Sequence, residues 1–184
     1  ATYQRTLEAR QIWGGIVNSS RTFAMQALDA FPDPAVRRRL LYRHVAWLTA
    51  LRYQLREPRA WENMQLVHNR EFRRRYHVAE WEEPIEPLLS ALLPPDEWAG
   101  LAARKSRATS ILALQMRDLR QAADPSVQGE LRHVELARTV AALVDAQGRS
   151  ERIKNFPYPR QFATLNLCFV WLFIALVPFG LVQE

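Results

Sequence analysis

The chain has 184 residues and a formal net charge of +6, with 25 Lys and Arg residues against 19 Asp and Glu residues. This length suits one domain or slightly more, and an apolar share of 48% is enough for a real core. The single cysteine, Cys168, excludes an intrachain disulfide and a cysteine metal cluster. The basic balance points to nucleic acid, anionic lipid or small anions as partners and does not choose among them.

Ala1 is followed directly by a helical pattern, without an initiator Met, a signal peptide or a capping residue. We interpret the chain as a piece of something longer. Apolar residues recur every three to four positions up to Leu28, which predicts a helix with one buried face. The positions are Leu7, Ile12, Trp13, Ile16, Val17, Phe23, Ala24 and Leu28.

The pair Gly14-Gly15 interrupts this first pattern. A phosphate-binding loop would need a preceding strand and more glycines in register, so we favour close packing on a neighbouring helix or a local bend. Pro32 and Pro34 then end the helix, because proline has no backbone donor and biases the residue before it away from helix.

A second helix is predicted from Ala35 to Arg56, antiparallel to the first because the link between them is short. Its apolar stripe contains Val36, Leu40, Leu41, His44, Val45, Leu48, Leu51 and Leu55, and we expect the arginines Arg37, Arg38, Arg39, Arg43 and Arg52 on the remaining surface.

Prolines interrupt the pattern after residue 57, and only short helices are expected, over residues 61–76, 85–93 and 95–104. Ser106 or Thr109 should cap a helix that reaches Ala123. The last helix before the apolar stretch is predicted over residues 127–147, with a core stripe of Leu136, Val140, Leu143 and Val144. We expect Gly148 as its C-terminal cap and residues 149–159 as a connector. No segment alternates with period two, so the predicted fold class is all-α.

Residues 161–183 carry no charge. As a helix this stretch would be about 35 Å long, enough to cross a hydrocarbon core of about 30 Å. Four basic residues precede it between positions 149 and 160, whereas only Glu184 follows it. The positive-inside rule therefore places Arg160 in the cytoplasm. A buried core helix remains the alternative, because Asn166 and Pro178 make the span imperfect.

The sequence offers no mechanism for an enzyme. The four histidines, at positions 44, 68, 77 and 133, form no HExxH or other paired ligand spacing, so we expect no metal and no cofactor. The acidic group Glu82, Glu83 and Glu86 is best interpreted as a solvated patch. The arginines are spread over several helices among glutamates, and no nucleic-acid recognition module can be identified.

Three blocks carry a more specific signal. They are YQRTLEARQIWGGIVN at residues 3–18, RHVAWLTALRYQLR at 43–56, and ERIKNFPYPR at 151–160, the last followed by VPFGLV at 177–182. In this order they resemble a prokaryotic member of the bestrophin family of ion channels. The likeness runs from end to end and is weakest between residues 57 and 104.

The resemblance implies a specific architecture. Bestrophin subunits have four membrane spans and assemble as pentamers around one pore, with a hydrophobic neck on the second span and helices below it that build a cytosolic vestibule. By this resemblance, residues 1–156 form an antiparallel helical body in the cytoplasm, continuous with the membrane helices. Residues 1–28 continue the pore-lining helix, and residues 161–183 form the third span. The neck, the first and fourth spans and the calcium clasp of animal members fall outside this sequence.

The implied function is a subunit of a homopentameric channel that passively conducts small ions, chloride or another monovalent ion, across the inner (plasma) membrane. Its partners would be other copies of itself, the permeant ions and the lipid bilayer, and no nucleic acid. The full-length protein would be multi-pass. The alternative is a membrane-tethered basic helical protein that docks nucleic acid or anionic lipid.

One site residue follows from the resemblance. The family has a second hydrophobic constriction at the cytosolic exit of the pore, and Leu131 is the closest match. A ring of five apolar side chains offers no replacement for hydration water and can gate by dewetting. An ordinary core leucine is the alternative for this position. Bulk charge does not decide whether anions or cations pass.

Overall fold

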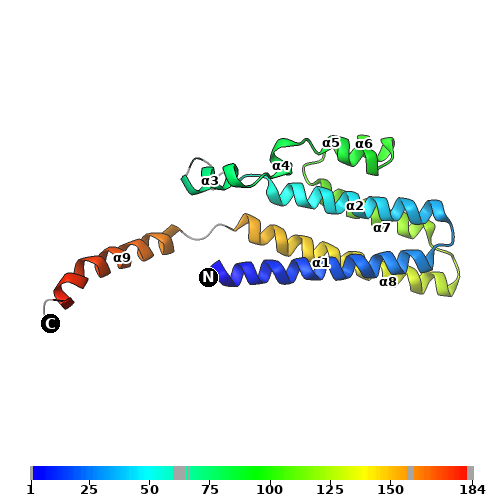
Figure 1. Ribbon diagram of the computed structural model, residues 1–184. Helices are drawn as coiled ribbons and strands as arrows, with labels where there is room; N and C mark the ends of the chain where they lie inside the picture. Colours follow the sequence, from blue (N-terminus) through cyan, green and yellow to red (C-terminus); the bar gives the residue numbers. More distant parts are fainter. Residues whose placement is uncertain (1, 60–64, 66, 157–159, 182–184) are drawn as a thin grey trace. The chain divides into compact units, whose positions relative to one another are not determined.

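The computed structural model describes residues 2–59, 65, 67–156 and 160–181. It divides into two units, Ala1–Lys154 and Asn155–Glu184, which are treated separately below. Within the described residues every regular element is a helix, and no strand is present. The all-α prediction is therefore confirmed for this part of the chain. The helices are α1 (Thr2–Ala30), α2 (Pro34–Arg56), α3 (Val67–Arg75), α4 (Ala79–Glu82), α5 (Glu86–Leu92), α6 (Pro95–Ala102), α7 (Arg107–Ala122), α8 (Val127–Asn155) and α9 (Arg160–Leu181) (Figure 1).

The turn between α1 and α2 explains why the first two helices are antiparallel. Asp33 is the N-cap of α2, and its Oδ1 accepts a hydrogen bond from the Ala35 backbone N–H at 2.8 Å. Pro34 occupies the first helical position, where a missing N–H costs nothing. The chain reverses here, and α2 returns alongside α1 as the sequence predicted (Figure 1).

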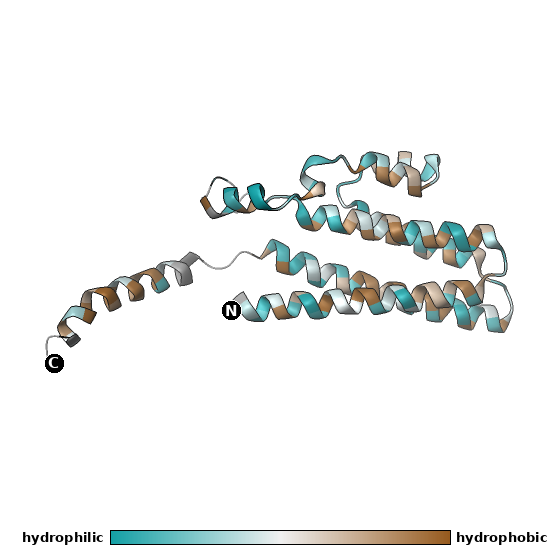
Figure 2. Cartoon of the chain, viewed as in Figure 1, coloured by the Kyte–Doolittle hydropathy of each residue, from teal (hydrophilic) through white to brown (hydrophobic). Residues whose placement is uncertain are grey.

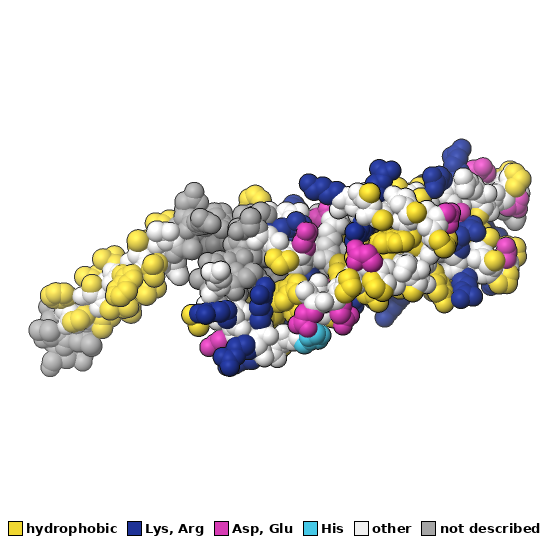
Figure 3. All heavy atoms as spheres, turned by 90° about the horizontal axis from the view of Figure 1, so that it is seen from above, with side chains coloured by type: hydrophobic (Ala, Val, Ile, Leu, Met, Phe, Trp, Pro, Cys, Tyr) yellow, Lys and Arg dark blue, Asp and Glu magenta, His cyan; other side chains and the backbone are white. Residues whose placement is uncertain are grey.

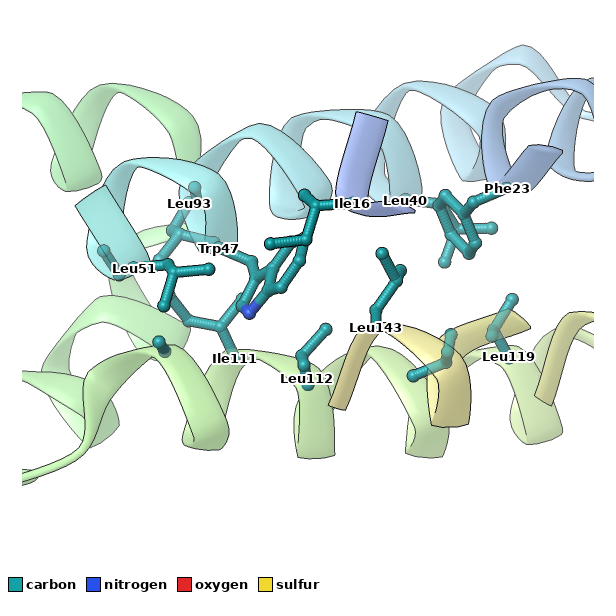
Figure 4. Close-up of a cluster of buried hydrophobic side chains, with 14 of the residues drawn as sticks. Ile16, Phe23, Leu40, Trp47, Leu51, Leu93, Ile111, Leu112, Leu119 and Leu143 are labelled. Atoms are coloured by element: carbon teal, nitrogen blue, oxygen red, sulfur yellow. The ribbon is translucent and has the colours of Figure 1, made fainter. Parts of the chain in front are cut away.

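Helix α2 is the centre of the first unit, because it packs on α1, α4, α5 and α7. Trp47 on α2 is completely buried and lies among Ile16 of α1 and Ile111 and Leu112 of α7 (Figure 4). Burial of large apolar side chains contributes roughly 1.5–3 kcal/mol for each one. The other fully buried large side chains are Phe23, Leu40, Leu51, Leu89, Leu119, Leu136, Val140 and Leu143.

The predicted buried face of α1 is only partly correct. Ile12, Ile16 and Phe23 are buried, but Leu7, Trp13, Val17 and Leu28 are exposed in the single chain. The same correction applies to Val45 on α2 and to Val144 on α8. The apolar pattern is wider than the stripe that a monomer can cover.

The interpretation of Gly14 and Gly15 is wrong for the single chain. Both are exposed inside an unbroken helix, and a Cβ at either position would meet nothing within 4 Å. Neither glycine is therefore required by close packing on another helix of this chain.

Helix α8 is longer than predicted. It runs through Gly148 to Asn155, so the predicted cap and most of the predicted connector are wrong. Two contacts with α1 hold the extra turns: Arg5 Nη2 donates to the Ile153 carbonyl at 2.6 Å, and Arg152 Nη2 donates to Glu8 Oε1 at 2.6 Å. The helix continues because these long-range contacts offset the cost of an internal glycine.

The described residues between α2 and α7 form four short helices. The expected helices over residues 85–93 and 95–104 correspond to α5 and α6, whereas α4 was not predicted. Most of the first half of the expected helix 61–76 lies outside the described residues, and its second half is α3. Ser106 precedes α7, but its hydroxyl donates to Thr109 Oγ1 at 2.8 Å and makes no cap bond to the backbone.

The second unit contains α9, which has Pro178 in its interior. Its described side chains, residues 164–180, are all exposed and uncharged, and Figures 2 and 3 show a predominantly hydrophobic surface. Within the part of the chain that is described, no helix has the length and apolar character needed to cross a membrane. The predicted span covers residues 161–183. Residues 182 and 183 and the side chains of residues 161–163 are not among those that the structure describes. The span therefore stays a prediction.

Gly129 in the first turn of α8 is the one glycine that packing requires. A Cβ there would lie 2.2 Å from the Asp124 carbonyl oxygen, which is held in a turn where Ser126 Oγ donates to the Asp124 carboxylate and accepts from the Gly129 N–H. We expect Gly129→Ala to destabilise the full-length protein by about 1–3 kcal/mol, measured by thermal unfolding.

Gly148→Ala is the matched control, because Gly148 is helical, exposed and has no neighbour within 4 Å of a new Cβ. It should raise stability by about 0.5–1 kcal/mol. Equal effects of the two substitutions would contradict the steric account.

Candidate functional site

A buried arginine joins three helices of the first unit. Arg43 lies in the middle of α2, and only 3% of its surface is exposed. Its Nε donates to Glu97 Oε2 of α6 at 3.0 Å, and its Nη2 pairs with the other oxygen of the same carboxylate. Its Nη1 donates to Asp118 Oδ2 of α7 at 2.8 Å and to Gln115 Oε1 at 3.3 Å. The expectation that Arg43 lies on the polar surface of α2 is wrong.

The pairing decides the charge state of this group. Burial alone would lower the pKa of Arg43, but the hydrogen bonds and charges of Glu97 and Asp118 outweigh it and raise that pKa. Burial likewise favours the neutral form of Asp118, yet the hydrogen bonds from Arg39 and Arg43 lower the pKa of this carboxyl below its ordinary value. Arg43 and Asp118 are therefore both ionised near neutral pH.

Gln115 connects this side-chain network to the backbone of α2. Its amide nitrogen donates to the Leu40 carbonyl at 3.0 Å while its oxygen accepts from Arg43. Arg39, one helical turn before Arg43, makes a two-point contact with Asp118, at 2.8 and 3.0 Å. Together these bonds fix the position of α7 along α2.

A second polar chain connects α2 to α7 and α8. The Trp47 indole N–H donates to Gln147 Oε1 at 2.8 Å, and Gln147 Nε2 donates to Thr109 Oγ1 at 2.8 Å and to Glu151 Oε1 at 2.7 Å. Gln54 near the end of α2 donates to the same Glu151 oxygen at 2.9 Å. This chain orients the C-terminal half of α8, which leads into the second unit.

His44, the neighbour of Arg43, is held among aromatic rings. Its ring stacks on Phe23 at 5.0 Å and lies 5.2 Å from the Trp47 ring, between centroids. Neither ring nitrogen has a hydrogen-bond partner. Burial lowers the pKa of His44 to about 4, so the ring is neutral at physiological pH.

Leu131, the predicted constriction residue, lies in the second turn of α8 and is 63% exposed. The alternative of an ordinary core leucine is therefore wrong for the single chain. Beside it, Arg132 and His133 line a pocket of about 440 Å³ between the α1–α2 turn and the start of α8. The structure does not bring Leu131 together with the polar network, and its role in an ion pathway stays a prediction.

No enzyme-like or metal-binding cluster emerges from these residues. Within the described part of the chain, no three His, Cys, Asp or Glu side chains lie close enough to hold a metal ion. His77 pairs with Glu82 at 3.2 Å on the surface, and Cys168 is a free, exposed thiol on α9.

The described residues thus form an all-α body joined by buried ion pairs, followed by a helix whose side chains from position 164 to 180 are uncharged. A family model described as bacterial/fungal bestrophin protein matches residues 1–184. The chain belongs to this family, which confirms the resemblance inferred from the three sequence blocks.

Named relatives cover the whole chain. The voltage-dependent anion channel-forming protein of Ralstonia nicotianae is 26% identical over 184 residues, which are 100% of this chain and 53% of the relative. The voltage-dependent anion channel-forming protein YneE of Escherichia coli is 25% identical over 185 residues, covering 100% of this chain and 52% of the relative. The chain therefore spans about half the length of these relatives, which are channel-forming proteins rather than enzymes.

Solved structures agree on the fold. A bestrophin homologue from Klebsiella pneumoniae, determined as a point variant, superposes with a TM-score of 0.76 at 23% identity and covers 100% of this chain and 60% of that chain. A second variant of that homologue gives a TM-score of 0.76 at 24% identity and covers 100% of this chain and 58% of the other.

Removal of the Arg43 charge should destabilise the body strongly. Arg43→Met leaves Glu97 partly buried without its cation and Asp118 with Arg39 alone, and we expect a loss of about 3–5 kcal/mol in the free energy of unfolding of the full-length protein. Arg38→Met is the control, because Arg38 lies on the same helix but is exposed. Similar small losses for both variants would show that the network is not structurally important.

His44 should make stability fall in acid. Its folded pKa of about 4 lies below the ordinary value of 6.5, so the unfolded chain binds more protons between these values. The neutral ring contributes roughly 3 kcal/mol to the free energy of unfolding. This contribution is complete above pH 6.5 and is lost as the pH falls to about 4.

His44→Phe keeps an aromatic ring at this position and removes the titration. Its unfolding temperature should therefore depend less on pH between 7 and 4 than that of the parent protein. If His44→Phe had the same dependence of unfolding temperature on pH as the parent protein, His44 would not be the source of the acid sensitivity.

Proposed function

We propose that the protein is a subunit of a homopentameric channel that passively conducts small anions such as chloride across the plasma membrane. The observation that carries the proposal is the family match over all 184 residues, together with relatives that are named anion channel-forming proteins. Chloride is chosen over a cation because these relatives are named anion channel-forming proteins.

Self-association is supported by the surface of the first unit. Large apolar side chains are exposed on two of its long helices, with Leu7, Trp13, Val17, Met25 and Leu28 on α1 and Leu131, Val134 and Val144 on α8. Exposed apolar surface of this kind is typical of interfaces between protein chains. Neighbouring subunits of a pentamer would cover part of it, and residues 1–28 would continue a pore-lining helix.

We propose further that residues 1–156 form the cytosolic vestibule and residues 161–183 cross the bilayer from the cytoplasm outwards. The uncharged, exposed side chains of residues 164–180 support this assignment, as do the basic residues on the N-terminal side of the stretch. The proposed span reaches beyond the described side chains at both ends, because it also includes positions 161–163 and 182–183.

Two measurements on the full-length protein test the proposal. Light scattering in detergent should give the mass of five subunits. In a planar bilayer with asymmetric chloride salt, the reversal potential should shift toward the chloride equilibrium potential. A monomeric mass or the absence of current would overturn the proposal, and a shift toward the cation potential would overturn anion selectivity.

Leu131 should act on the current and not on assembly. An exposed apolar ring around a narrow pore impedes hydrated ions, so Leu131→Ala should raise the single-channel conductance or change the ion preference, with the five-subunit mass retained.

Val144→Ala is the control for this experiment, because Val144 is also an exposed apolar residue of α8 and lies more than three turns further along the helix. Its currents should match those of the parent channel. Unaltered currents in Leu131→Ala would remove this residue from the ion pathway.

A further inference from the structure

A pocket of about 520 Å³ lies at the C-terminal end of α2, away from Leu131. Its wall is formed by the last turn of α2, by α3 and α4, and by the loop that leads into α7. Among the described residues, four basic side chains line it, Arg73, Arg104, Lys105 and Arg107, together with the two acidic residues Glu57 and Glu80.

The acidic residues of the lining are already neutralised. Glu80 pairs with Arg52 at 2.8 Å, and Glu57 pairs with Arg59 at 3.2 Å, and neither of these arginines belongs to the lining. Arg107 pairs with Glu86 at 3.3 Å. The pocket therefore has an excess of positive charge.

Three cations of the lining lack a carboxylate. Among the described residues, no acidic side chain pairs with Arg104 or Lys105. Arg73 contacts only the face of the Trp81 ring, at 5.1 Å from its centroid. A guanidinium and an ammonium held near one cavity are the groups that bind phosphate in proteins.

Two further features favour an anion. Tyr53 is one of the lining residues, and its hydroxyl is buried without a hydrogen-bond partner, although it can donate a hydrogen bond. Helix α7 begins at Arg107, and the Ser106 side chain does not cap it. The first turn of a helix attracts negative charge through its free N–H groups.

The lining also has an apolar part. Ala50, Trp81 and Ile85 contribute to it, and the Trp81 ring is fixed because its N–H donates to the Arg56 carbonyl at 2.8 Å. We propose that this pocket binds a phosphate group attached to a small organic body, either a soluble phosphate ester or the headgroup of an anionic lipid. This site is separate from the ion pathway and does not depend on the channel proposal.

The test measures binding to the full-length protein in detergent by isothermal titration calorimetry. One arm uses glycerol phosphate, and the other uses a short-chain phosphatidylglycerol with short-chain phosphatidylcholine as its uncharged counterpart. We expect saturable binding in at least one arm. The double variant Arg104→Ala, Lys105→Ala should weaken it about tenfold or more, because each lost charge-assisted contact contributes substantially to affinity.

Tyr53→Phe removes only the unpartnered hydroxyl and should also weaken binding, with folding retained. The control is Arg120→Ala, Arg138→Ala, which removes the same charge at exposed positions outside the pocket and should leave binding unchanged. Binding of glycerol phosphate identifies a soluble ligand, whereas binding of phosphatidylglycerol alone identifies a lipid. Equal weakening by the pocket and control variants, or no saturable binding in either arm, would overturn the site. The readout is binding and not current, so its failure leaves the channel proposal untouched.

Discussion

A guanidinium that is removed from water must meet acceptors at fixed distances, because an unpaired buried charge costs several kcal/mol. In this protein Arg43 satisfies that requirement with Glu97 from α6 and with Gln115 and Asp118 from α7. Two separate helices, α6 and α7, must therefore reach one point on α2 at the same time. Apolar contacts are non-directional and would tolerate small sliding movements of one helix along another. The hydrogen bonds of Arg43 are directional and allow one position of α6 and α7 along α2.

The same requirement continues along α2 toward the second unit. One turn after Arg43, the Trp47 indole N–H leads through Gln147 to Thr109 and Glu151, and so determines where the end of α8 lies. In a channel subunit this matters because α8 is the helix that carries Leu131 near its start and leads into the apolar stretch at its end. The polar contacts of the core thereby hold the helix that connects the two segments to which the proposed function gives a role.

Much of the fold could be predicted from the sequence, since long periodic helices such as α1, α2 and α7 are determined locally by apolar spacing and by proline and Asp33 at their ends. Arg43 and Gln147 could not be recognised as core residues, because a polar side chain is buried only when partners distant in sequence satisfy it. Gly148 likewise resembles a helix end unless the contacts of α8 with Arg5 and Glu8 are known. Trp13 and Val17 have the spacing of core residues but are exposed, because apolar spacing alone does not distinguish side chains buried within one chain from apolar side chains on its surface. Leu131 came from the family resemblance alone.

The central claim is that Arg43 and Asp118 stabilise the body as a pair, and a double-mutant cycle tests it most directly. The free energies of unfolding of the full-length protein, Arg43→Met, Asp118→Asn and the double variant give their coupling. The account predicts a coupling of at least about 1 kcal/mol, because the two groups share hydrogen bonds within one network. Additivity to within about 0.5 kcal/mol would contradict it.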